Sequence, residues 1–120
     1  MLKNSLLLLI TCLFTIAAFA QKPKNGTYHF SIAYHNGESK PKNLKCDVII
    51  RGDSILVVND GSIPEMEKGA PIDGGRLMIH RKTGKWVIGR SPADRNAPEA
   101  GGCEGGPTIV DFKRKLVWLC

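Results

Sequence analysis

The chain has 120 residues, of which 42% are hydrophobic and 23% charged, and its formal net charge is +6. This length allows one domain with a single modest core. No internal repeat or low-complexity tract divides the chain, and after the first twenty residues no apolar segment is long enough to cross a bilayer. These features exclude a multi-domain enzyme and a multi-span membrane protein, and the basic excess favours acidic partners.

Residues 1–20 have the layout of a secretory signal peptide. Lys3 gives a positive start, Leu6–Ala17 form a short apolar run, and Ala18–Ala20 supply the small-x-small pattern of a cleavage site. We therefore expect cleavage after Ala20 and a single secreted or periplasmic domain over residues 21–120. Removing Lys3 lowers the net charge by one. The mature chain then meets an oxidising compartment, where cysteines tend to pair.

Two alternatives for the first segment stay open. Cys12 lies in the apolar run, but Thr11 and Ile10 before it fit lipoprotein processing poorly. A retained N-terminal anchor is the other alternative, although no basic stop-transfer cluster follows the run directly.

The mature chain begins with strict alternation between residues 27 and 35. Tyr28, Phe30, Ile32 and Tyr34 point to one side, which predicts a half-buried strand. Two β-branched runs, 48–50 and 55–58, then flank Gly52-Asp53. This spacing predicts a hairpin with its bend at that dipeptide.

The rest of the chain predicts two more hairpins and two irregular regions. Residues 63–75 contain two prolines and three glycines without a clean period, and we interpret them as a loop. Residues 77–80 and 86–88 form the second hairpin, turning near Thr83-Gly84. Ser91 and the residues after it predict one helical turn. Residues 108–119 form the last hairpin around Lys113-Arg114, with apolar residues on both faces.

About seven short strands with at most one helical turn predict an all-β fold, a small antiparallel meander closed as a barrel or a sandwich. A strand that is apolar on both faces is central or covered on both sides. The last hairpin is therefore expected to be covered on both sides.

The segment "GGCEGGP" at 101–107 lacks the strand, helix and Lys-Ser/Thr of a phosphate loop. A turn at Lys113-Arg114 sets Pro107 opposite Cys120, and the glycines let Cys103 fold back toward that end. We therefore predict a disulfide between Cys103 and Cys120 and a buried free thiol at Cys46. Spacing alone leaves open a bond from Cys46 to either of the other two.

The strings "GTYHFSIAY", "CDVIIRGDSILVVNDG", "HRKTGKWVI" and "GGCEGGPTIVDFKRKLVWLC" resemble short secreted proteins of Bacteroidota-type bacteria. The resemblance covers nearly the whole mature chain, and GGC-x-GGP with the terminal Trp-x-Cys is its most specific part. It implies a compartment and a kind of organism, with no activity attached. Size, export and a late disulfide are also similar to the small barrels of periplasmic lysozyme inhibitors, but no inhibitory motif is matched.

No catalytic, cofactor or metal site is expected from the sequence. The acidic residues lie on turns, no nucleophile stands in a recognisable elbow, and the histidines have no ligand spacing. "RGDS" at 51–54 is interpreted as a hairpin turn. The basic residues gather at strand ends and tips: Lys22 and Lys24; Lys40, Lys42 and Lys45; Arg81, Lys82 and Lys85; Lys113, Arg114 and Lys115.

These observations favour a non-enzymatic exported domain that binds a small ligand or an anionic component such as a glycan or a lipid surface. Nucleic acid is not expected as a partner, because the chain is exported and shows no aromatic-basic recognition sheet. The alternative is an inhibitor of a secreted or periplasmic enzyme, although the positive charge argues against a basic lysozyme as its target. The side chains that either face a ligand or fill the core are Tyr28, Phe30, Trp86 and Trp118.

Overall fold

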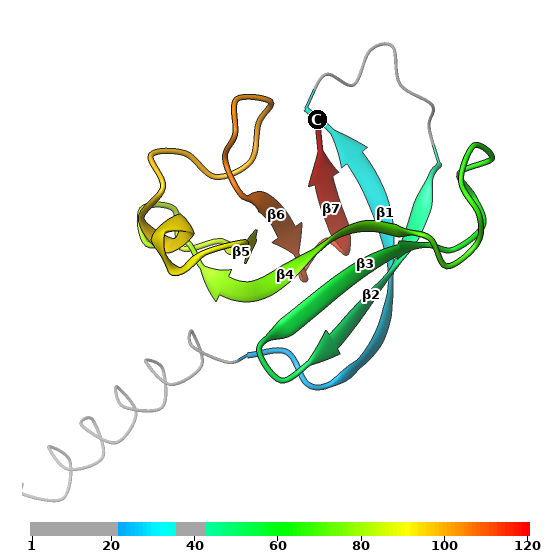
Figure 1. Ribbon diagram of the computed structural model, residues 1–120, viewed down its shortest axis with the longest axis horizontal. Helices are drawn as coiled ribbons and strands as arrows, with labels where there is room; N and C mark the ends of the chain where they lie inside the picture. The colour runs from blue at the N-terminus through cyan, green and yellow to red at the C-terminus, as the bar shows by residue number, and fades with distance from the viewer. Residues whose placement is uncertain (1–21, 36–42) are drawn as a thin grey trace, which may run out of the picture.

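The computed structural model describes residues 22–35 and 43–120, so the predicted signal peptide lies outside the described residues. Within these residues seven strands form one sheet, which closes into a barrel in chain order (Figure 1). The all-β prediction is confirmed, and the architecture is a barrel and not a sandwich. The strands are β1 (Gly26–Tyr34), β2 (Lys45–Arg51), β3 (Ser54–Asn59), β4 (Pro71–Ile79), β5 (Trp86–Gly89), β6 (Thr108–Asp111) and β7 (Leu116–Leu119).

The barrel closes by a parallel pairing of β1 with β7, which runs from Ser31↔Leu116 to Tyr34↔Leu119. All other neighbouring strands are antiparallel. In a meander each strand reverses direction, so the first and seventh run the same way. Parallel closure follows from the odd strand number, and it removes the free sheet edges that β1 and β7 would otherwise present.

The β2–β3 hairpin has the predicted register, because Arg51 pairs with Ser54 across a two-residue turn at Gly52-Asp53. That register places five apolar side chains on the inner face of the barrel, as the alternation predicts. Each of them is at most 3% exposed: Cys46, Val48, Ile50, Ile55 and Val57.

The loop predicted for residues 63–75 is wrong over its second half, because β4 begins at Pro71. Proline is tolerated at the first position of a strand. A Cβ added at Gly75 would lie 2.5 Å from the carbonyl oxygen of Gly89, so the neighbouring strand lies too close there for any side chain. The glycines that hid the strand from pattern analysis are thus the residues that let β4 approach β5.

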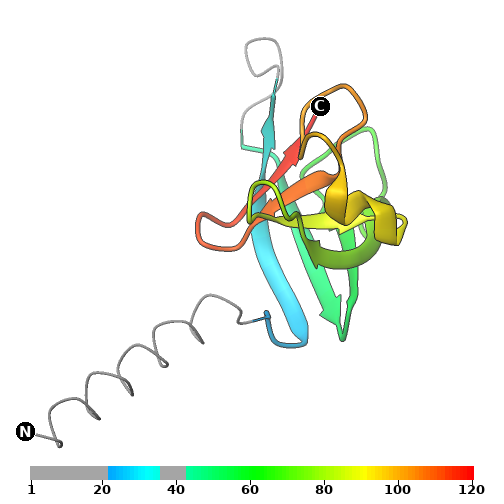
Figure 2. The ribbon, with the colours of Figure 1, turned by 90° about the vertical axis from the view of Figure 1, so that its left-hand side faces the viewer.

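The single helical turn predicted after Ser91 is confirmed as a 3₁₀ turn, η3 (Pro92–Asn96). The Asp94 carboxylate accepts hydrogen bonds from the backbone N–H groups of Arg90 and Ser91, at 2.7 and 3.3 Å. It thereby satisfies two donors at the start of the turn. Figure 2 shows η3 and the loop that follows it on one side of the barrel.

Apolar side chains form two clusters, one inside the barrel and one outside it. The inner cluster contains Val110 and Val117 of the last hairpin. The outer cluster contains Met78, Val87 and Ile109, with Ala100 and Trp118 packed against it. The prediction that the last hairpin is covered on both sides is therefore confirmed.

Cys46 is a buried free cysteine, as predicted, and its side chain has no solvent exposure. Burial raises the pKa of its thiol to about 12, with smaller contributions from the carboxylates of Asp60 and Asp47. Thiolates and not thiols are the reactive form. The Cys46 side chain is thus both inaccessible and protonated at neutral pH.

We expect a thiol reagent such as Ellman's reagent to leave the folded mature chain unmodified and to label one cysteine after denaturation. The pKa of the Cys46 thiol is higher in the folded than in the unfolded chain. The stability that this group contributes is therefore fully present below about pH 8.5, and it is lost as the pH rises toward the folded pKa. A Cys46→Ala variant lacks this part of the alkaline decline. Rapid labelling of the folded protein would contradict the prediction.

Candidate functional site

A groove of about 850 Å³ lies between the β4–β5 turn and the β6–β7 hairpin. It is lined by aromatic, aliphatic and basic side chains in a size range typical of ligand sites. The lining residues are His35, Gly84, Lys85, Trp86, Ile109, Val110, Asp111, Phe112, Lys113, Arg114 and Trp118.

The groove follows from the short pairing of β5 with β6. These strands pair at two positions, Val87↔Ile109 and Ile88↔Thr108, whereas β1 and β2 pair at six. Continuing the register would set Trp86 opposite Val110, but this pair is not formed. The seam therefore opens beyond Val87, and residues on both of its sides line the groove.

Two pairs of aromatic rings line this opening. The Trp86 ring packs edge-on against the Phe112 ring, with centroids 6.4 Å apart and an interplanar angle of 86°. Trp118 is on β7, and its ring lies 5.2 Å from the His35 ring at an angle of 35°. Both tryptophans are half-buried, so each keeps part of its ring accessible from the groove.

Basic side chains surround the groove, and one carboxylate lies among them. The Asp111 carboxylate accepts a hydrogen bond from the backbone N–H of Arg114 at 2.9 Å and lies 3.9 Å from the Arg114 Nε. Within the part of the chain that the structure describes, Lys85 and Lys113 form no ion pair. The two lysine ammonium groups are therefore available to an anionic ligand.

The structure separates the four aromatic residues singled out in the sequence. Phe30 is 3% exposed and belongs to the inner cluster, and Tyr28 packs against that cluster. Trp86 also packs against the inner cluster and Trp118 against the outer one, and both of these rings line the groove. The Phe112 ring lies 5.5 Å from Phe30 and 6.3 Å from Tyr28, so it connects the inner cluster to the groove.

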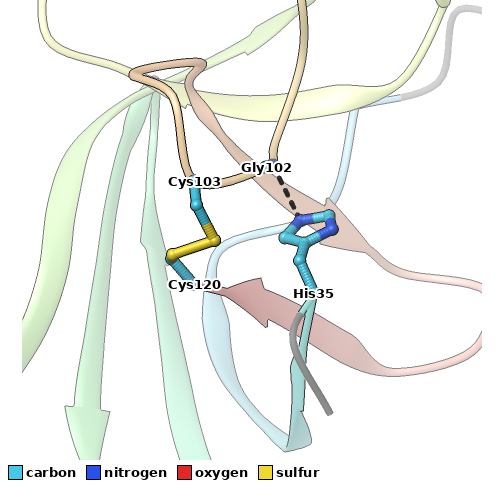
Figure 3. Close-up of a disulfide and its surroundings, with 4 residues drawn as sticks. All are labelled: His35, Gly102, Cys103 and Cys120. Carbon is cyan, nitrogen blue, oxygen red and sulfur yellow. Dashed lines mark hydrogen bonds between the residues drawn. A yellow bond between two sulfur atoms is a disulfide. The ribbon is translucent and has the colours of Figure 1, made fainter.

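The predicted disulfide is present, with the Cys103 and Cys120 Cα atoms 5.0 Å apart. Figure 3 shows that it ties the 101–107 loop to the end of β7, next to the His35 ring. The backbone N–H of Gly102 donates to the Nε2 of His35 at 2.9 Å. The loop thus holds the ring that packs on Trp118, and the bridge supports one end of the groove.

Two glycines of this loop, Gly101 and Gly106, are required by its close packing. A Cβ added at Gly101 would lie 2.7 Å from Ile109 Cδ1, and one at Gly106 would lie 2.5 Å from the Gly101 carbonyl oxygen. Gly101 also has a φ of 72°, which favours glycine. The glycines therefore serve the path of the loop that carries Cys103.

Sequence reasoning missed His35 and Phe112 as lining residues of the groove. Lys113 and Arg114 were noted only as basic residues at a hairpin tip. Basic residues at a hairpin tip are typical of solvent-exposed turns. The local sequence does not show which other turn of the fold lies next to them. Their position near Trp86 depends on the pairing of β5 with β6, which sets the β6–β7 hairpin beside the β4–β5 turn.

His29 and His80 each have hydrogen-bond partners within the protein. His29 Nδ1 lies 2.7 Å from an Asp47 carboxylate oxygen, and the fully buried His80 ring contacts the Thr83 hydroxyl and the Ala97 carbonyl. Among residues 22–35 and 43–120, no three His, Cys, Asp or Glu side chains gather as a metal site would require.

Comparison of the chain with protein-family models, with curated proteins and with solved structures gave no match. In the described ranges, none of the helical segments has the length and apolar character needed to cross a membrane.

Proposed function

We propose that this protein is an exported, non-catalytic binding domain, and that its ligand occupies the groove between β5 and β6. The observation that carries the proposal is the combination of two accessible tryptophan rings with unpaired lysines around one concave site. Such a site suits a ligand with a flat apolar or sugar face and at least one negative charge.

Export is supported by the layout of residues 1–20 and by the Cys103–Cys120 bond, which is compatible with an oxidising compartment. The barrel itself is filled by the inner cluster, so a ligand is expected at this lateral opening and not in the barrel centre. The bound component would belong to the cell envelope or the medium.

The intrinsic fluorescence of this protein is a direct probe of the groove, because the only two tryptophans of the chain both line it. We expect a saturable change in tryptophan emission when the mature domain is titrated with an acidic polysaccharide such as polygalacturonate. No such change is expected with a neutral polysaccharide such as dextran. Because exposed charges contribute, affinity should fall as the ionic strength rises to about 0.15 M and beyond, where the Debye length is about 8 Å or less.

Two charge-matched variants test the location of the ligand. Lys113→Gln removes a lysine of the groove, whereas Lys68→Gln removes an exposed lysine on the β3–β4 loop that does not line it. We expect about a twofold to fivefold loss of affinity for the first and no change for the second, in line with the energies of exposed ion pairs. Equal losses, or no binding to any anionic component, would contradict the proposal. A stoichiometric complex with a secreted enzyme that is insensitive to Lys113→Gln would favour the inhibitor alternative.

A further inference from the structure

A second groove of about 440 Å³ shares Trp86 with the first. Its apolar lining includes Leu77, Met78 and Ile79 of β4. Its basic side chains are Lys22, Arg81 and Arg95, which come from the N-terminal segment, from the residue after His80, and from η3. The Arg81 N–H donates to the Arg95 carbonyl at 2.9 Å, which holds the two segments together.

We propose that the two grooves form one extended site, which binds a polyanionic glycan chain that crosses Trp86. This inference rests on the proposed function and adds the class and length of the ligand. Because one ring lines both grooves, they are neighbours, and a chain that passes over Trp86 can contact both. A small molecule would occupy one groove and leave the other open.

The charges of the two grooves favour a ligand with repeated negative charge. Six lysine and arginine side chains line them, against two aspartates. Each aspartate contacts a basic neighbour, Asp53 with Lys22 and Asp111 with Arg114. Four cations therefore have no carboxylate partner among the described residues: Lys85 and Lys113 in the first groove, and Arg81 and Arg95 in the second.

Two physical features favour a glycan over a lipid surface or a nucleic acid. A flat bilayer is met by protruding apolar side chains, and among the described residues Leu56 is the only large hydrophobic residue that is exposed. Single-stranded nucleic acid needs a row of rings for successive bases, and the second groove is lined by one aromatic ring, Trp86, together with aliphatic side chains of β4. Sugar rings pack on a single aromatic face, and arginines bind carboxylate or sulfate groups in a bidentate way.

The test compares galacturonate oligomers with long polygalacturonate, using tryptophan emission and calorimetry on the mature domain. We expect the polymer to bind about tenfold or more tightly per occupied site than a short oligomer, because contacts in the second groove become intramolecular. In an Arg81→Ser/Arg95→Ser variant we expect the polymer affinity to fall to that of the short oligomer, with oligomer affinity unchanged. The matched control is Arg51→Ser/Arg76→Ser, which removes two exposed arginines that line neither groove.

The outcomes separate the two proposals. Binding of oligomer and polymer with equal affinity, or a polymer affinity that Arg81→Ser/Arg95→Ser leaves unchanged, overturns the extended site while the first groove remains a binding site. If the wild-type domain binds no anionic glycan, both the extended site and the proposed function are overturned. Tighter binding to single-stranded DNA or to anionic phosphatidylglycerol vesicles than to the polymer overturns the assignment to glycans. Circular dichroism of every variant confirms that it is folded.

Discussion

Removing the Cys103–Cys120 disulfide is expected to lower the free energy of unfolding by about 3 kcal/mol. The bridge closes a loop with a sequence separation of 17 residues, and its loss returns that conformational freedom to the unfolded chain. The folded state also loses the anchor of the 101–107 loop, which covers Ile109 from outside the barrel. For a domain of this size the change is a large fraction of the total stability. Urea denaturation of a Cys103→Ser/Cys120→Ser variant measures it.

Reduction of the wild-type protein provides the matched control. Dithiothreitol should lower the midpoint of the mature wild-type domain (residues 21–120) to that of the mature double variant. It should leave the mature double variant unchanged, because the one thiol that remains there, Cys46, is buried and unpaired. A non-reducing peptide map should show a 103–120 crosslink and an unlinked Cys46. An unchanged midpoint on reduction would show that the backbone bond from the Gly101 N–H to the Pro107 carbonyl holds the loop without the bridge.

Replacing Asn59 is expected to have a comparable or larger effect, about 3–5 kcal/mol for Asn59→Ala. The side chain ends β3 and is 1% exposed. Its Nδ2 donates to the carbonyls of Ile63, Met66 and Glu67 at 3.0–3.2 Å, and its Oδ1 accepts from the Gly61 and Ile63 N–H groups at 3.1 Å. Truncation removes this partner from the Met66 carbonyl and from the Gly61 and Ile63 N–H groups, which are buried or part-buried, and each such loss is costly. The Ile63 and Glu67 carbonyls keep bonds from the Met66 and Ala70 N–H groups.

An Asn59→Asp variant separates hydrogen bonding from packing, because the two side chains have nearly the same shape. An ionised carboxylate cannot donate, so three carbonyl oxygens would face a negative charge. We expect it to be at least as unstable as Asn59→Ala at neutral pH and to regain stability under acidic conditions where it protonates. Asn96→Ala, at an exposed position, should change stability by less than about 0.5 kcal/mol. A small effect at Asn59 would mean that the β3–β4 loop is held by other contacts.

Local features of the chain were predicted correctly because they depend on few residues. The Gly52-Asp53 turn fixes the pairing of Arg51 with Ser54, and one pairing sets the whole hairpin register. The disulfide followed in the same way, since the observed pairing of Ile109 with Trp118 extends to Pro107 opposite Cys120. The turn after Ser91 needed only its proline and acidic residue.

Features that depend on distant segments were not predicted. The first half of β4 has no alternating apolar pattern of its own. It forms a strand because it pairs with β3 and because its glycines leave room for the backbone of Gly89. The interpretation of residues 63–75 as a loop failed there for that reason. The choice of a barrel over a sandwich also required the pairing of β1 with β7, whose paired residues are far apart in the sequence.

The candidate site shows the same division. Composition and the basic tips indicated an anionic partner, and the aromatic residues were marked individually. Only the tertiary structure shows that Phe30 is buried in the core and that Trp86 and Trp118 line the same groove. It also shows that Arg81 and Arg95 line a second groove together with Trp86. Sequence periodicity determines which face of a strand is buried. The early end of the β5–β6 pairing, which opens the groove, depends on how seven strands close around one core.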